Sequence, residues 1–316
     1  MLPGIIFVEQ PAAPALLAPD PGRTAYGLWW EGWDGSNWAL STDTSGIILM
    51  RGVRGLGRIT EEHHRDEHAS IAGSRWRDAR ALNREVFLPL HVYAEGDSQA
   101  WVDHHRAFAR TMRKGKTGWL HIVHPNGHHR RLECRYERGM EEAYELDPAF
   151  FGWATYGVYL TAEQPYWEGV KPVQRRWGAA PPVYFFGGGT EGPTAGPPFG
   201  IAASNQIDDA QVTNESDEEV FAIWRLSGTG PTSLEINGEV IEVPFSVPAE
   251  ETLTIDMRPE FQIAYLSDGT DVTGDLGTFD FSPIQPDELT KLGIEVTGNT
   301  GDVSLEFTPL YEWGVS

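Results

Sequence analysis

The residue pattern that most resembles a catalytic motif is His64-Arg65-Asp66-Glu67-His68. Two histidines four positions apart on a helix can bind zinc, and the intervening glutamate can act as a general base, as in the H-x-x-E-H pattern of inverzincin proteases. The surrounding segment is polar and has no helical apolar period, so the sequence does not place this motif on a helix. A zinc-dependent hydrolase built on His64, Glu67 and His68 is therefore the remote alternative.

The other residues that could do chemistry are histidines and aromatic side chains. All ten histidines lie between His63 and His129, and strand alternation would place His121 and His124 on opposite faces. Four aromatic residues in the second half of the chain could stack on sugar rings, although most aromatics of a sandwich belong to its core. These four candidates are Trp224, Tyr265, Tyr311 and Trp313. We predict no catalytic residues, no cofactor and no resident metal.

The charge is distributed unevenly and excludes several classes of function. Of the formal net charge of −22, residues 1–165 carry −3 and residues 166–316 carry −19. A strongly acidic chain does not bind nucleic acid through its phosphates, so sequence-specific DNA binding is disfavoured. The single cysteine, Cys134, excludes an intrachain disulfide, and no apolar run is long enough to span a membrane. The start of the chain lacks the features of a signal peptide.

The elements that position these residues are short strands joined by turns. Apolar residues alternate on both sides of the Asp34-Gly35 turn, and they continue in residues 47–50, 85–93, 119–124, 130–136 and 154–162. Pro89 suggests an edge strand or a bulge. One helix is predicted from Ser98 to Lys114 with Gly115 as its C-cap, and Gly52 to Gly73 is predicted to be a long loop.

The second half of the chain predicts a separate β domain. Residues 166–200 are rich in proline and glycine, which is typical of a linker or an extended crossover. Beyond them, about eight short strands at 8–12-residue spacing indicate a sandwich. We therefore expect a mainly β protein with an N-terminal sandwich or split-barrel domain (1–165) that carries one helix. A linker (166–200) and a C-terminal β-sandwich of jelly-roll type (201–316) follow.

Taken together, these segments resemble the distal tail (Dit-like) proteins of siphoviruses. The matching stretches are Asp34-Gly35, residues 45–57, Arg84–Val92, the helix that follows, Thr161–Trp167, Asn214–Trp224, Thr252–Asp256, Asp268-Gly269 and Val303–Trp313. The resemblance covers nearly the whole chain, and no single motif in it is diagnostic.

The resemblance implies a structural virion protein of the phage tail tip, assembled in the cytoplasm of the host bacterium. In this family a hexameric ring forms through the N-terminal domain, joins the tail tube to the tip or baseplate and passes DNA. The implied partners are the tail tube protein, hub or tip proteins and the tape measure protein. The segment from Arg58 to Trp76 resembles the arm by which ring subunits embrace, so His63, His64, Arg65, Asp66, Glu67 and His68 are candidate interaction residues.

The C-terminal domain of this family has the shape of a carbohydrate-binding module. The main alternative is therefore a carbohydrate-binding baseplate or surface module that attaches to a host glycan. Saturable glycan binding by the C-terminal half alone would favour this alternative, whereas ring formation by the N-terminal half would favour the tail-tip interpretation.

Overall fold

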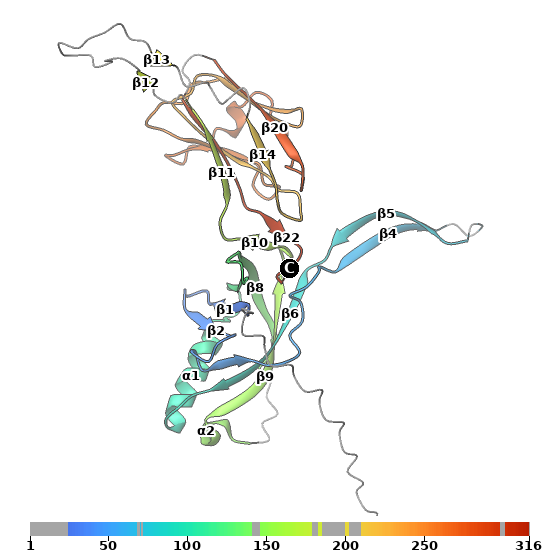
Figure 1. The fold of residues 1–316 in the computed structure, drawn as a ribbon, viewed down its shortest axis with the longest axis vertical. Helices are drawn as coiled ribbons and strands as arrows, with labels where there is room; N and C mark the ends of the chain where they lie inside the picture. Colours follow the sequence, from blue (N-terminus) through green and yellow to red (C-terminus); the bar gives the residue numbers. More distant parts are fainter. Residues whose placement is uncertain are drawn as a thin grey trace, which may run out of the picture.

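The computed structural model describes residues 25–315 of the 316-residue chain, apart from 68–69, 71, 141–145, 179–182, 185–199, 202–209 and 298–300. The protein is mainly β. Its antiparallel sheets enclose two separate hydrophobic cores, one in each half of the chain (Figure 1). Within the described ranges, no helix is both long and apolar enough to cross a membrane.

The N-terminal half forms a nearly closed, seven-strand antiparallel barrel. Its strands follow the order β2-β1-β7-β8-β9-β6-β3. They are β1 (Gly27–Glu31), β2 (Asn37–Ala39), β3 (Ile47–Leu49), β6 (Arg84–Tyr93), β7 (Thr117–Val123), β8 (His129–Gly139) and β9 (Trp153–Ala162). The two outer strands of the path approach each other, because the Leu49 amide donates to the carbonyl of Leu40 just after β2 (3.0 Å). The strands predicted from apolar alternation are confirmed.

Helix α1 (Ser98–Arg110) covers the barrel and buries Trp101 and Phe108. It ends before the predicted Lys114, at the C-cap residue Thr111. The Thr111 hydroxyl donates to the carbonyl of Phe108 (2.7 Å) and accepts from the indole of Trp30 (2.9 Å), so this residue joins the helix end to the barrel core. A second short helix, α2 (Pro148–Phe151), precedes β9.

Pro89 does not mark an edge strand, because β6 lies between β9 and β3. The Pro89 carbonyl accepts from the Met50 amide, one residue beyond the end of β3. Since the nitrogen and carbonyl of a strand residue face the same side, the missing N–H of Pro89 points to a position where β3 has already ended. The proline is therefore tolerated inside the sheet.

The C-terminal half consists of a five-stranded and a four-stranded antiparallel sheet that share one core. The first has the order β11-β21-β15-β18-β19 and the second β14-β20-β16-β17. The strands are β11 (Val173–Trp177), β14 (Gln211–Thr213), β15 (Ile223–Ser227), β16 (Thr232–Ile236), β17 (Glu239–Val243), β18 (Leu253–Asp256), β19 (Ile263–Leu266), β20 (Leu289–Val296) and β21 (Asp302–Phe307). A short 3₁₀ helix spans Thr273–Asp275. Residues 278–281 form no strand, and Phe279 makes only an isolated bridge to Ile241.

The predicted linker (166–200) contains regular structure at its start. Strand β10 (Trp167–Gly169) pairs with β8 of the barrel, and β11 belongs to the five-stranded sheet. The two-residue strands β12 (Val183–Tyr184) and β13 (Gly200–Ile201) pair with each other, while residues 185–199 lie outside the described residues. Near the C-terminus of the chain, β22 (Leu310–Tyr311) pairs with β10. Leu310 packs against the core of the sandwich, whereas Tyr311 packs against the barrel core.

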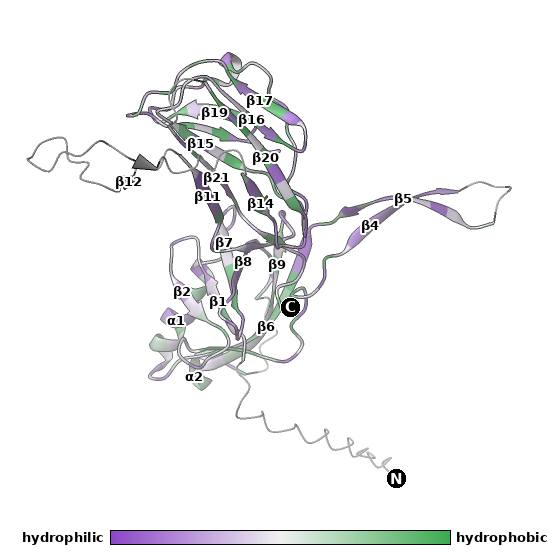
Figure 2. Ribbon diagram, turned by 45° about the horizontal axis from the view of Figure 1, so that its top comes forward, coloured by the Kyte–Doolittle hydropathy of each residue, from purple (hydrophilic) through white to green (hydrophobic). Residues whose placement is uncertain are grey.

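The segment predicted as a long loop contains the first strand of a β-hairpin. Strands β4 (Glu61–Glu67) and β5 (Ser74–Ala81) form a two-stranded antiparallel ribbon that projects from the barrel (Figures 1 and 2). We call this ribbon the arm. Its residues are largely hydrophilic on both faces, so no apolar alternation revealed its strands in the sequence.

Candidate functional site

The arm carries the histidine motif, and its geometry removes the basis of the zinc interpretation. His64 and Glu67 are exposed residues of strand β4, which lacks the helical spacing that the H-x-x-E-H pattern requires. His68 lies outside the described residues. Among the residues that the structure describes, no group of three potential ligands is arranged to hold a metal ion.

Ion pairs across the arm hold its two strands together. Arg77 pairs with Asp66, and Arg80 pairs with Glu62 (2.7 Å). The pairing slips by one residue between His64 and Arg65, which brings Arg65 opposite Trp76. Trp76 is 59% exposed, which makes it one of the most exposed large side chains described. The arm therefore presents a solvent-facing tryptophan beside Arg65 and Arg75, which pair with no carboxylate among the described residues. This arrangement is suited to binding another protein surface.

The root of the arm is fixed by Arg84, whose side chain is almost completely buried. Its guanidinium donates to the carbonyls of Pro165 (2.6 Å), Gly55 (2.9 Å), Gly57 (2.6 Å) and Glu312 (2.6 Å). Gly55 and Gly57 precede the arm, whereas Glu312 belongs to the end of the chain. Arg84 thus joins the arm root, the end of β9 and the C-terminal segment, and no sequence motif had indicated this role.

The C-terminal segment is held on the barrel by two further side chains. Arg130 donates to the carbonyl of Trp313 and lies 3.9 Å from the centre of the Tyr311 ring. His124 Nε2 lies 2.8 Å from the carbonyl of Gly314. These contacts extend the β10–β22 pairing and hold the two ends of the C-terminal sandwich against the barrel.

A second histidine group lies on the barrel surface at β1, β7 and β8. His121 Nε2 is 2.9 Å from Glu31 Oε2, and His121 Nδ1 is 2.9 Å from His129 Nε2. The indole of Trp29 stacks on the His121 ring at 4.8 Å. Burial lowers the pKa values of His121 and His129, while Glu31 opposes this effect at His121. As expected, His124 does not join this group, whereas the convergence of His121 with His129 was not predicted from the sequence.

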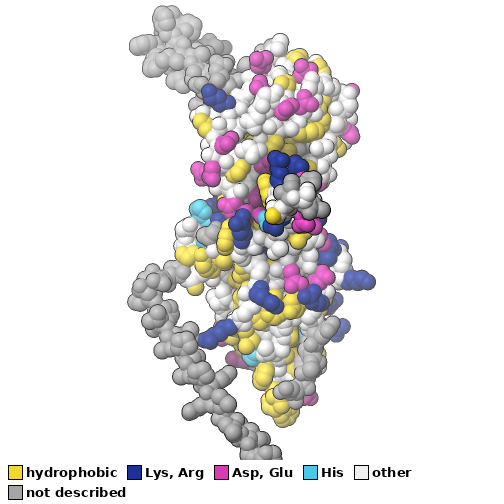
Figure 3. All heavy atoms as spheres, turned by 90° about the vertical axis from the view of Figure 1, so that its right-hand side faces the viewer, with side chains coloured by type: hydrophobic (Ala, Val, Ile, Leu, Met, Phe, Trp, Pro, Cys, Tyr) yellow, Lys and Arg dark blue, Asp and Glu magenta, His cyan; other side chains and the backbone are white. Residues whose placement is uncertain are grey.

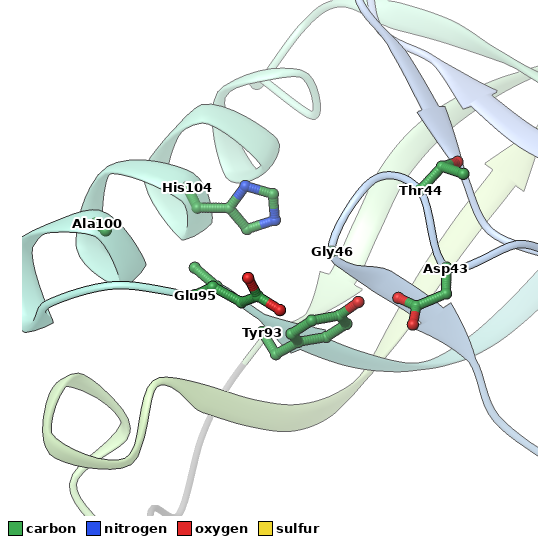
Figure 4. Close-up of a pocket in the computed structure, with 8 residues that line it drawn as sticks. Asp43, Thr44, Gly46, Tyr93, Glu95, Ala100 and His104 are labelled. Carbon is green, nitrogen blue, oxygen red and sulfur yellow. The ribbon is translucent and has the colours of Figure 1, made fainter.

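The cavity in Figure 4 lies between helix α1 and the loop before β3 and has a volume of about 440 Å³. Asp43 and Glu95 contribute carboxylates, and His104 enters from α1. Burial lowers the pKa of His104, so its ring is mainly neutral at neutral pH. The two carboxylates can accept hydrogen bonds from a cationic or hydroxyl-bearing group, but this set supplies neither a nucleophile with an adjacent base nor a metal centre.

A cleft of about 500 Å³ separates the barrel from the C-terminal sandwich. Within it, Arg131 pairs with Glu168 (3.1 Å), and Tyr166 hydrogen-bonds to Glu218. Burial raises the pKa of Glu168, against the opposing effect of Arg131. Burial and then the charge of Glu312 raise the pKa of Glu218. The polar groups of this cleft bind one another, which is typical of a junction between two domains.

The four sugar-stacking candidates do not form one platform. Trp224 is fully buried in the core of the sandwich, so the prediction that it contacts sugar is wrong. Tyr311 is covered by Arg130. Tyr265 (38% exposed) lies on β19 of the five-stranded sheet, whereas Trp313 (39% exposed) lies in the segment that packs on the barrel. The strand position of Tyr265 was predictable, but its separation from Trp313 depends on the return of the chain to the barrel.

Comparison with known proteins identifies the fold. No protein-family model and no curated protein matches the sequence. Among solved structures, the crystal structure of the SPP1 Dit (gp 19.1) protein matches with a TM-score of 0.63 and 12% sequence identity, over 91% of this chain and 99% of that one. The chain has the Dit fold.

Chains of the phage P2 baseplate in its activated conformation also match. The calcium form has a TM-score of 0.51 at 11% identity and covers 92% of this chain and 100% of that one. The strontium form has a TM-score of 0.50 at 9% identity with the same coverage. The predicted resemblance to distal tail proteins is therefore confirmed at the level of the fold, across both halves of the chain.

Proposed function

We propose that this chain is a structural subunit of a siphophage tail tip, a distal tail protein that forms a six-membered ring between the tail tube and the tip or baseplate. The observation that carries the proposal is the match to SPP1 Dit over 91% of this chain and 99% of that one, since it includes both halves and their connection. The SPP1 protein is described as a paradigm of the hub adsorption apparatus in phages that infect Gram-positive bacteria.

The geometry of the arm is a second argument for the proposed ring. An isolated two-stranded hairpin is at best marginally stable in water, so a projecting ribbon gains stability when a neighbouring surface covers it. Trp76 would supply the apolar anchor of that contact, and Arg65 and Arg75 would supply cations that no described carboxylate pairs. A head-to-tail contact of this kind forms a ring when its rotation closes. The exposed residues His63, His64 and Glu67 flank the anchor and are proposed interaction residues.

The charge distribution fits this geometry. On the face shown in Figure 3, basic side chains gather over the barrel and arm, and acidic side chains predominate on the C-terminal sandwich. Residues 1–165 are close to neutral, so six barrels can approach one another without strong repulsion. The overall net charge of −22 disfavours adhesion to DNA, as a conduit for DNA requires.

In this proposal the protein is part of the virion and is assembled in the host cytoplasm. Its neighbours are the tail tube protein, the hub or tip proteins and the tape measure protein. The C-terminal domain is a jelly-roll sandwich with the shape of a carbohydrate module. The alternative function, binding of a host glycan by that domain, rests on Tyr265, the exposed aromatic residue of β19.

Sedimentation of the purified full chain tests the proposal. The wild-type protein is expected to sediment as a six-chain species at micromolar concentration. Loss of a central aromatic anchor costs about 2 kcal/mol or more, so Trp76→Ser should weaken association by about thirtyfold. Tyr265→Ser is the matched control, because it removes a partly exposed aromatic residue from the sandwich. A monomeric wild-type protein at tens of micromolar, or equal association of the two variants, would refute the proposal.

A further inference from the structure

A pocket of about 270 Å³ lies where the turn between β7 and β8 meets β10 and β22. Four of its side chains are basic or can become so, namely His128, His129, Arg130 and Lys171, and Tyr311 completes the side-chain lining. Two glycines contribute backbone. None of the described residues that line this pocket carries a carboxylate, although acidic residues outnumber basic ones 46 to 24 in the chain. Such a lining attracts an anion.

Arg130 is held in place at one side of this pocket. Its guanidinium donates to the Trp313 carbonyl and lies over the Tyr311 ring. Asp217, whose carboxylate accepts from the Glu312 amide (2.9 Å), stabilises the charge of this guanidinium. The Arg130 cation is therefore prepositioned, which reduces the entropy that an incoming ligand must offset.

Lys171 and His128 differ from the neighbouring arginines of β8. Both are exposed, and within the described residues their side chains form no ion pair or hydrogen bond. By contrast, Arg131 pairs with Glu168, Arg135 with Glu163, and Arg138 with Glu85. Lys171 and His128 therefore line this pocket without a partner among the described residues.

A chain of hydrogen bonds fixes the protonation of His129. The Glu31 carboxylate accepts from Nε2–H of His121, so the neutral His121 ring accepts at Nδ1 from Nε2–H of His129. His129 Nδ1 is then the nitrogen that gains a proton. His121 and the indole of Trp29 contact the His129 ring, and the Arg131 and pocket cations lie near it. Burial, followed by the Arg131 charge, lowers the pKa of His129. A bound anion would favour the proton at Nδ1, because opposite charges stabilise each other.

We propose that this pocket binds a phosphate-bearing ligand. A phosphate offers several strong acceptor oxygens to the Lys171 ammonium, the Arg130 guanidinium and protonated histidine. The volume lies below the roughly 300 Å³ at which pockets take drug-sized molecules, so the ligand is a small phosphate ester or the phosphate of a larger chain that enters by one group. This binding activity goes beyond the proposed role in tail assembly.

The test is isothermal titration of the full-length protein with inorganic phosphate, glycerol 3-phosphate and glycerophosphoglycerol at pH 6.0 and 8.0. We expect binding that weakens at the higher pH, because the His129 ring then loses the proton at Nδ1 that a bound anion stabilises. Lys171→Gln should weaken it about tenfold, the loss typical of one charge-assisted hydrogen bond. Lys114→Gln, a change at an exposed lysine after α1, should leave it unchanged. Tightest binding of glycerophosphoglycerol, the phosphodiester among the probes, would assign the site to a phosphate polymer or lipid headgroup. Tightest binding of inorganic phosphate would assign it to the free ion.

Absence of binding of all three probes at millimolar concentration would overturn the proposal. Equal weakening by Lys171→Gln and Lys114→Gln would also overturn it, because it would show general electrostatic attraction. Sedimentation of Lys171→Gln separates this test from the test of ring formation. No residue of the arm lines the pocket, so the variant is expected to assemble like the wild type.

Discussion

Replacement of Arg84 by alanine tests whether one side chain holds the arm root, β9 and the C-terminal segment together. The change leaves four carbonyl groups without their donor. The contact with Pro165 is buried, and an unsatisfied buried acceptor costs about 1–3 kcal/mol. The other three are partly buried and regain water in part, for about 0.5 kcal/mol each. We expect the free energy of unfolding to fall by about 3 kcal/mol.

Urea unfolding followed by tryptophan fluorescence measures this change, with unchanged m values as the check that the same surface unfolds. Arg84→Lys keeps the charge but places all its donors on one nitrogen, so it can reach fewer of the four carbonyls. Its free energy of unfolding should lie between those of the wild type and Arg84→Ala. Arg138→Ala is the matched control, because it removes an exposed arginine of β8 paired with Glu85 and should change little. A loss below about 1 kcal/mol for Arg84→Ala would refute the reasoning.

Three further predictions follow from burial. Trp224→Ala should destabilise the sandwich by about 3–5 kcal/mol, whereas Trp313→Ala should cost clearly less, as two urea titrations would show. Burial lowers the folded-state pKa of His121 below its unfolded value near 6.5. The neutral ring therefore contributes stability that is present above pH 6.5 and lost as pH falls through the folded-state pKa. The melting temperature of His121→Gln should depend less on pH between 7.5 and 5.5 than that of the wild type. Burial raises the pKa of Glu218, so keeping this carboxylate ionised lowers the stability of the folded protein at neutral pH. Glu218→Gln should therefore melt at or above the wild-type temperature at pH 7.5. This difference in melting temperature should vanish near pH 4.5, where the wild-type carboxyl is protonated.

The elements that the sequence predicted correctly are those whose two faces differ in polarity. Strand β6 alternates buried and less buried residues along its length, and the β7–β8 hairpin carries a Pro-Asn-Gly turn, so both were predictable from period and turn chemistry. The arm was missed because both of its faces are polar, and such a strand has no apolar period. The early end of α1 was missed because Thr111 binds Trp30, a residue far away in the sequence.

The candidate sites depend on contacts between distant parts of the chain. Glu31 meets His121 because β1 and β7 are neighbours in a register that pairs Trp29 with His121. The phosphate pocket forms only because Tyr311 returns to the barrel through β22. Local patterns carry no information on either pairing. The burial of Trp224, by contrast, could have been predicted, because Trp224 and Leu226 occupy alternate positions on one face of β15.

Native mass spectrometry of the full-length protein tests the central claim most directly. Spectra recorded at tens of micromolar chain concentration should show a species of six times the 35.1 kDa chain mass, without intermediate sizes dominating, as expected for a closed ring. The Trp76→Ser variant should show mainly the single chain under the same conditions. A wild-type spectrum containing only the 35.1 kDa chain, or an open series of growing oligomers, would contradict the account.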